Sequence, residues 1–170
     1  PRGWAFKTMS GDDISRFKST RKRLDISPVV IHTSYLINVA SADPALRMKS
    51  IEMLAVEMDR ADAIGADYVI LHPGSASGDD ADIARKRAVN ALQEVAAMVI
   101  WNARLLIENT AGERGDVSSG IRELADILRG VRGNLLSGIC FDTCHAFAAG
   151  YDLRSDQIIR KISDDTKKYI

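Results

Sequence analysis

The sequence predicts an α/β fold built on a parallel sheet, and three observations support this prediction. Four short runs are rich in branched apolar residues, at residues 28–33, 68–72, 104–108 and 138–142. Each run is nearly continuous in hydrophobicity, which is typical of parallel strands that helices cover on both faces. Segments with helical periodicity separate the runs, so the chain repeats a strand-helix-strand unit that gives a parallel sheet or barrel.

The segments between the predicted strands carry the signals of crossover helices. After the first strand, Asp43 can cap a helix that begins with proline and that Gly65 ends. The next helix follows the acidic stretch at residues 79–82, which suits a helix N-terminus. An apolar stripe at helical spacing predicts a third helix over residues 118–129, and a polar helix begins near Ser155.

The length of the chain bounds its architecture. No low-complexity tract or long linker interrupts the 170 residues, so we expect one domain over residues 1–170. A complete TIM barrel has eight strands and about 250 residues. If the sheet belongs to such a barrel, the barrel is incomplete in this chain, and we expect the missing parts to lie beyond both ends.

Composition and charge exclude several classes of protein. No stretch approaches the roughly 18 to 20 apolar residues of a membrane helix, and no signal-peptide pattern is found, so we expect a cytoplasmic protein. The two cysteines, Cys140 and Cys144, are too few for a disulfide scaffold and predict reduced thiols. Lys plus Arg and Asp plus Glu both number 23, so overall charge gives no support to nucleic-acid binding.

Ionisable side chains gather where the predicted strands end. His32, His72, Glu108 and Asp142 lie at the four strand ends, and His145 follows the last one closely. The carboxyl ends of parallel strands converge on one crevice, so these residues are expected to meet. Imidazole and carboxylate groups are ligands of zinc or manganese, and five of them can hold more than one ion. A lone histidine at a strand end is more often structural, but five such residues together favour a metal centre.

The predicted metal centre narrows the chemistry to two classes. A multinuclear centre favours phosphoester hydrolysis, because one ion can activate water while others neutralise the phosphate and stabilise the leaving oxygen. A sugar isomerase would show a similar pattern of residues. The residues by themselves therefore predict a metal-dependent α/β enzyme that acts on a phosphoester or a sugar.

Four segments of the chain resemble the endonuclease IV family. They are residues 32–38 (HTSYLIN), 72–75 (HPGS), 108–112 (ENTAG) and 141–152 (FDTCHAFAAGYD). Their order and spacing also match, and the last segment is a long and specific string. The resemblance runs from Pro1 to about Arg154. It implies a TIM (β/α)8 barrel of the xylose isomerase-like type that holds three zinc ions and cleaves DNA 5′ to abasic sites, leaving a 3′-hydroxyl.

The resemblance also implies a role for each candidate ligand. His32 and His72 resemble the ligands of the first zinc ion, and Glu108 resembles the catalytic carboxylate that bridges the first and second ions. Asp142 would bind the second ion and His145 the third. The implied cofactor is therefore Zn²⁺, with fewer than three ions expected in this chain.

Three residues match positions at which the family inserts side chains into the DNA stack to flip the abasic nucleotide out: Arg2, Tyr35 and Leu36. Unstacking costs a few kcal/mol and is easiest at a damaged site, so flipping helps to select the lesion. Tyr35 and Leu36 could instead pack within their own loop. The implied partner is double-stranded DNA with abasic sites, no membrane is involved, and the complete enzyme is expected to be a monomer.

The match to the family leaves some points open. The family takes further zinc ligands from strands beyond the segment that matches Tyr151, so these 170 residues alone are expected to be weakly active or inactive. Asn109 could orient a metal ligand or contact a phosphate, and the spacing does not decide. The alternative function is a xylose isomerase-like sugar isomerase or epimerase with a divalent metal, but such enzymes rely on carboxylates, whereas three histidines beside Tyr35 and Leu36 favour the nuclease.

Overall fold

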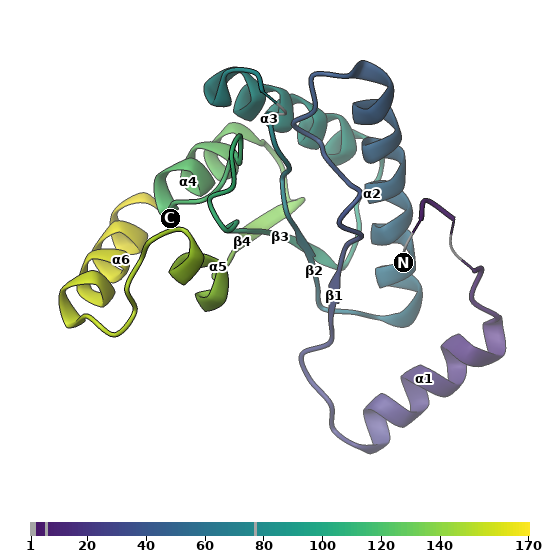
Figure 1. The fold of residues 1–170 in the computed structure, drawn as a ribbon. Helices are drawn as coiled ribbons and strands as arrows, with labels where there is room; N and C mark the ends of the chain where they lie inside the picture. Colours follow the sequence, from purple (N-terminus) through teal and green to yellow (C-terminus); the bar gives the residue numbers. More distant parts are fainter. Residues whose placement is uncertain (1–2, 6, 77) are drawn as a thin grey trace.

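Figure 1 shows the fold in the computed structural model, which describes residues 3–5, 7–76 and 78–170. The strands are β1 (Val30–His32), β2 (Tyr68–Leu71), β3 (Arg104–Glu108) and β4 (Leu136–Cys140). The helices are α1 (Gly11–Arg23), α2 (Pro44–Ile64), α3 (Ala81–Met98), α4 (Ile121–Gly130), α5 (Thr143–Ala148) and α6 (Asp156–Tyr169). The strands pair in parallel in the order β1-β2-β3-β4. The described residues thus form the predicted α/β sheet, with half of the eight strands of a TIM barrel.

Helices α2 and α3 begin where the sequence predicts, and α2 also ends there. The side chain of Asp43 accepts a hydrogen bond from the N–H of Ala45 at the start of α2, 2.8 Å away. Gly65 ends α2 in the left-handed conformation, with φ of 71°, which glycine adopts without steric cost. Asp80 caps α3 by accepting from the N–H groups of Asp82 and Ile83. These local signals fix where each helix returns the chain to the sheet.

The sheet and its helices form two layers. Helices α2, α3 and α4 lie along one face of the sheet (Figure 1), and Val69, Leu71, Leu105 and Ile107 are fully buried in the core. The alternate residues on β2 and β3 are less buried. The expectation that helices cover both faces is therefore wrong for the described residues. The fold explains the difference, because the second face of a barrel strand points to the barrel interior instead of a helix layer.

One strand and one helix also begin at other residues than predicted. The fourth strand spans Leu136–Cys140 and not residues 138–142, because Asp142 caps the short helix α5 by accepting from the N–H of His145 at 2.7 Å. The helix predicted from residue 118 begins only at Ile121. Ser118 is fully buried instead, and its hydroxyl donates to the carbonyl of Glu108 at 3.1 Å. Both shifts place polar residues beside the end of β3.

The loop after β1 is tied to the loop after β2 by the side chain of Asn38. Its amide donates to the carbonyl of Ser75, and its oxygen accepts from the N–H groups of Ser75 and Ala40, each at 3.1 Å. Gly74 has φ of 110°, and a side chain there would overlap Asn38. Glycine is therefore required at this close approach. The loops that follow His32 and His72 are held together as one unit.

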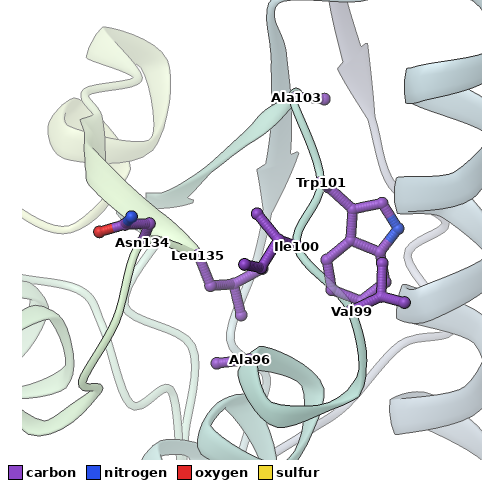
Figure 2. Close-up of a pocket in the computed structure, with 7 residues that line it drawn as sticks. All are labelled: Ala96, Val99, Ile100, Trp101, Ala103, Asn134 and Leu135. Atoms are coloured by element: carbon purple, nitrogen blue, oxygen red, sulfur yellow. The ribbon is translucent and has the colours of Figure 1, made fainter.

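A small pocket lined mainly by apolar residues lies at the amino ends of the strands (Figure 2). It is lined by residues between α3 and β3 and by the chain just before β4, including Ile100, Trp101 and Leu135. No candidate ligand lines this pocket. Within the described part of the chain, no helix is long and apolar enough to cross a membrane. Cys140 and Cys144 are free thiols, as predicted.

Candidate metal centre

The five predicted ligands gather at the carboxyl ends of the strands. His32 and Glu108 are the last residues of β1 and β3, and His72 directly follows β2. Asp142 and His145 lie at the start of α5, just beyond β4. Parallel pairing brings these ends side by side, as the sequence predicts.

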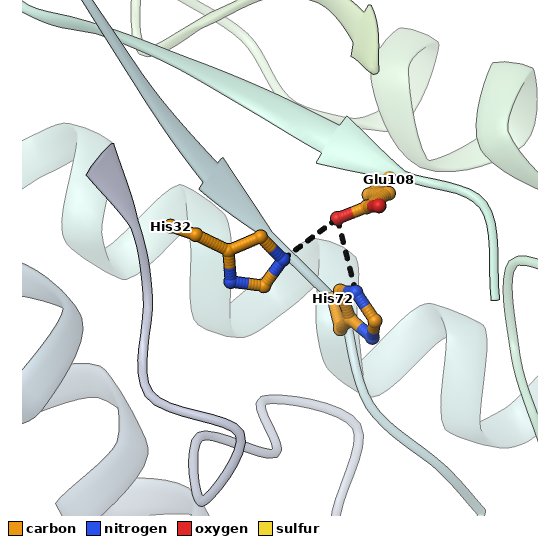
Figure 3. A group of neighbouring side chains, drawn as sticks. All are labelled: His32, His72 and Glu108. Carbon is orange, nitrogen blue, oxygen red and sulfur yellow. Dashed lines mark hydrogen bonds and ion pairs between the residues drawn. The ribbon is translucent and has the colours of Figure 1, made fainter. Parts of the chain in front are cut away.

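The first group of ligand atoms comes from His32, His72 and Glu108 (Figure 3). The Nε2 atoms of His32 and His72 lie 2.8 and 3.0 Å from the same oxygen of Glu108, Oε2. The two imidazole rings meet edge to face, with centroids 5.1 Å apart. Glu108 is only 3% exposed, and its contacts with these two rings offset the cost of burying its carboxylate.

The hydrogen bonds around these rings fit a bound cation. His32 Nδ1 lies 2.9 Å from the carbonyl of Thr33 and can only donate to it, so in the neutral ring Nε2 carries a lone pair. That lone pair faces the carboxylate of Glu108, and only a proton or a metal ion between them makes the contact favourable. His72 Nε2 is buried and has no hydrogen bond of good geometry among the described residues. Two imidazoles and one carboxylate oxygen thus converge as candidate metal donors.

The second group of ligand atoms comes from Glu108, Asp142 and His145. His145 Nδ1 lies 3.4 Å from Oε1 of Glu108 and 3.8 Å from Oδ1 of Asp142. Glu108 belongs to both groups, and it offers a different oxygen to each: Oε2 to the first and Oε1 to the second. This arrangement places one buried carboxylate between two candidate ion positions.

His145 has a hydrogen bond that decides which of its nitrogens is free. Nδ1 lies 3.0 Å from the carbonyl oxygen of Asn109, and a carbonyl can only accept. A proton on Nδ1 leaves Nε2 as the nitrogen that can bind a metal. Nδ1 is the nitrogen that lies near Glu108 and Asp142, but its hydrogen bond to Asn109 favours Nε2 as the ligand atom and therefore an ion position other than the one between these two carboxylates.

The electrostatics of the site depend on Glu108. Burial alone would raise the pKa of Glu108, but the close contacts and the charge of His32 and His72 outweigh burial and lower it to about 2. The hydrogen bond with Glu108 in turn raises the pKa of His32, although burial opposes this. Burial raises the pKa of the Cys140 thiol, and the nearby carboxylate of Glu108 adds to the rise. At neutral pH the site therefore holds an ionised carboxylate and a protonated thiol.

The structure shows the contacts of two residues beside the candidate ligands, Asn109 and Ser118. The side chain of Asn109, which the spacing left unassigned, is 1% exposed and bonds to the backbone of Asp142, so it does not reach outward toward a phosphate. Ser118, which holds the carbonyl of Glu108, was not predicted as part of the site. Its position in the sequence gives no signal, because its contact depends on how the loop after β3 folds back.

The predicted DNA-contacting residues lie in different surroundings. Tyr35 is 74% exposed in the turn after β1, so packing within the loop does not account for its side chain. Leu36 is partly buried, and its N–H bonds to the hydroxyl of Ser34 at 3.4 Å. Arg2 lies outside the described residues. Ile37, two residues after Tyr35, is buried in the core.

A parallel α/β sheet that presents imidazoles and carboxylates at the carboxyl ends of its strands is typical of TIM-barrel proteins. A family model described as xylose isomerase-like TIM barrel matches residues 1–170, and the chain belongs to this family. The predicted fold class is therefore confirmed.

Proteins named probable endonuclease 4 are similar to the whole chain. The protein from Halothermothrix orenii is 39% identical over 170 residues, covering 100% of this chain and 61% of its own length. The protein from Thermoplasma acidophilum is 40% identical over 151 residues, covering 89% of this chain and 51% of its own length. These matches confirm the resemblance to endonuclease IV. The chain spans about 60% of the length of the first of these relatives.

Solved structures agree with the sequence comparison. The crystal structure of endonuclease IV from Thermus thermophilus matches with a TM-score of 0.79 and 33% identity, covering 99% of this chain and 58% of that one. A D-tagatose 3-epimerase-like protein matches with a TM-score of 0.71 and 22% identity over 90% of this chain and 58% of that one. At that identity the likeness shows the shared fold alone.

Proposed function

We propose that the protein that contains this chain is a DNA repair endonuclease that hydrolyses the phosphodiester on the 5′ side of abasic sites and leaves a 3′-hydroxyl. The observation that carries the proposal is the buried carboxylate of Glu108, which offers one oxygen to each of two ligand groups. Neighbouring ion positions that share a carboxylate suit phosphoester hydrolysis. The endonuclease IV relatives support DNA as the substrate.

The chemistry of the donors supports zinc as the cofactor. His32, His72 and Oε2 of Glu108 would hold a first ion, and Oε1 of Glu108 with Asp142 would hold a second. His145 would bind a third ion through Nε2, because its Nδ1 is engaged by Asn109. Nitrogen and carboxylate oxygen donors are typical of zinc sites. When bound, the ions would activate the attacking water and neutralise charge on the phosphate.

The residues of the chain hold this centre in place. The carbonyl of Thr33 orients the ring of His32, and the carbonyl of Asn109 orients the ring of His145. Glu108 stays ionised at neutral pH because its pKa is about 2. Both of its oxygens face ligand groups, so we assign Glu108 the role of a ligand and not of a general base.

The exposed turn at Tyr35 and Leu36 is the proposed wedge that enters the DNA stack. Replacing both residues by alanine is expected to weaken binding to abasic DNA about tenfold or more, since stacking of one base on an aromatic ring contributes about 1–3 kcal/mol. Binding is measured by fluorescence anisotropy with a duplex that carries a tetrahydrofuran abasic analogue. Met98→Ala is the control, because Met98 is a half-exposed apolar residue at the far end of α3. A double variant that binds as tightly as the control would contradict the wedge.

The proposed reaction is tested with the natural polypeptide that contains this chain. We expect it to nick a duplex with a single tetrahydrofuran site, on the 5′ side of the lesion, and to leave an undamaged duplex intact. Removing metal with a chelator is expected to stop nicking, and added Zn²⁺ is expected to restore it. A zinc-loaded polypeptide that leaves the damaged duplex intact but converts a ketose sugar would contradict the proposal and favour the epimerase.

A further inference from the structure

Asn109 carries a side-chain amide that is buried beside both candidate ligand groups. It directly follows Glu108 at the end of β3 and is 1% exposed. Its Oδ1 accepts from the N–H of Asp142 at 2.7 Å, and its Nδ2 donates to the carbonyl of Asp142 at 3.0 Å. The amide therefore satisfies both backbone groups of one candidate ligand at once.

The backbone of Asn109 contacts the same region. Its carbonyl oxygen lies 3.0 Å from Nδ1 of His145, and its N–H donates to the carbonyl of Cys140 at 3.4 Å. Asp142 in turn accepts from the N–H of His145 at 2.7 Å. A single residue on β3 thus contacts Asp142 and His145, although both lie more than 30 positions away in the sequence.

The position of Asn109 matters because the strand pairing stops before Asp142 and His145. The last pair between β3 and β4 joins Glu108 to Cys140. Asp142 lies two residues beyond that pair and has no strand partner. The side chain of Asn109 has the same donor and acceptor as a peptide group, and it continues the link between the two strands as far as Asp142.

We propose that Asn109 is a positioning residue that sets where Asp142 and His145 lie relative to Glu108. This inference rests on the proposed function, because it assumes that Asp142 and His145 bind metal ions. Partners of metal ligands commonly change metal affinity about 10- to 100-fold when they are removed. A purely structural asparagine would change the stability of the fold and leave the number and environment of bound ions unaltered.

Two variants separate these roles. Asn109→Leu keeps a similar volume but leaves the N–H of Asp142 without its partner and removes one of the two donors to its carbonyl, which still accepts from the N–H of Ala146 at 3.0 Å. Asn109→Asp keeps an acceptor for the N–H but places a second oxygen against the carbonyl. Thr110→Val is the matched control, since Thr110 is the next residue, is 5% exposed, and its hydroxyl has no hydrogen-bond partner among the described residues.

The test is a titration of the metal-free natural polypeptide with Co²⁺, followed by visible absorption, together with circular dichroism to check folding. We expect both Asn109 variants to bind at least one ion 10- to 100-fold more weakly, or to lose it, and to show altered cobalt absorption bands. Thr110→Val is expected to match the wild type in number of ions and spectrum. If Asn109→Leu does not fold, Asn109→Asp decides the question.

The outcomes are distinguishable without measuring nicking. Folded Asn109 variants with the wild-type number of ions, affinity and spectrum would overturn the positioning role and leave the proposed nuclease intact. Altered cobalt binding in both variants supports the role, even in a protein that fails to nick DNA. A wild-type polypeptide that binds no Co²⁺ at all would overturn both proposals.

Discussion

Glu108→Gln is expected to lower the rate of nicking at a tetrahydrofuran site by at least about 10³-fold, or roughly 4 kcal/mol in activation free energy. Glutamine has nearly the same shape as glutamate but no charge, and its amide nitrogen would face one of the two ligand groups. Both groups would lose their shared anion, because Oε2 faces His32 and His72 while Oε1 faces His145. The effect is measured by single-turnover nicking with saturating Zn²⁺.

The control for this variant is Glu113→Gln. Glu113 lies in the loop that follows β3 and is exposed, and it belongs to neither ligand group. The control is expected to nick at the wild-type rate and to bind the same number of ions. Glu108→Gln is also expected to bind fewer ions. If it retained the wild-type rate and metal content, the bridging role would be wrong.

The sheet could be predicted well where local sequence decides the structure. The strand over residues 104–108 is predicted with both ends correct, because its apolar run stops at Glu108. The strand over Leu136–Cys140 is misplaced by two residues, since Ser137 and Gly138 interrupt its hydrophobic pattern. The structure accommodates this interruption by a register shift where Leu105 and Leu106 pair with Leu136 and Gly138. Such an irregularity depends on the partner strand and has no local signal.

The candidate site also has one part that the sequence predicts and one part that it does not. That His32, His72 and Glu108 meet follows from their places at the ends of parallel strands, which the hydrophobic pattern predicts. Which oxygen of Glu108 faces which ligand depends on a side-chain rotamer, and the peptide-like pairing of Asn109 depends on how the chain leaves β4. Contacts between residues that are distant in sequence set both features, so only the three-dimensional structure reveals them.

Proton binding by the metal-free protein has two opposing effects on its stability. The pKa of Glu108 is lowered from 4.5 to about 2, so its contribution to stability is present above pH 4.5 and is lost as the pH falls toward 2. The pKa of His32 is raised above 6.5, so its contribution is present below pH 6.5 and is lost as the pH rises through the raised value. These two groups together favour the metal-free fold most between about pH 4.5 and 6.5.

Metal binding is expected to weaken as the pH falls. An ion at the first group must displace the proton that His32 binds below its raised pKa, so the apparent affinity is expected to fall about tenfold for each pH unit below that pKa. Calorimetry with Zn²⁺ in two buffers of different ionisation enthalpy measures the proton released. Glu108→Gln removes the hydrogen bond that raises the pKa of His32 and is expected to release fewer protons at pH 7. An affinity that does not change between pH 7 and pH 5 would show that the ion does not compete with this proton, and His32 would then not be a ligand.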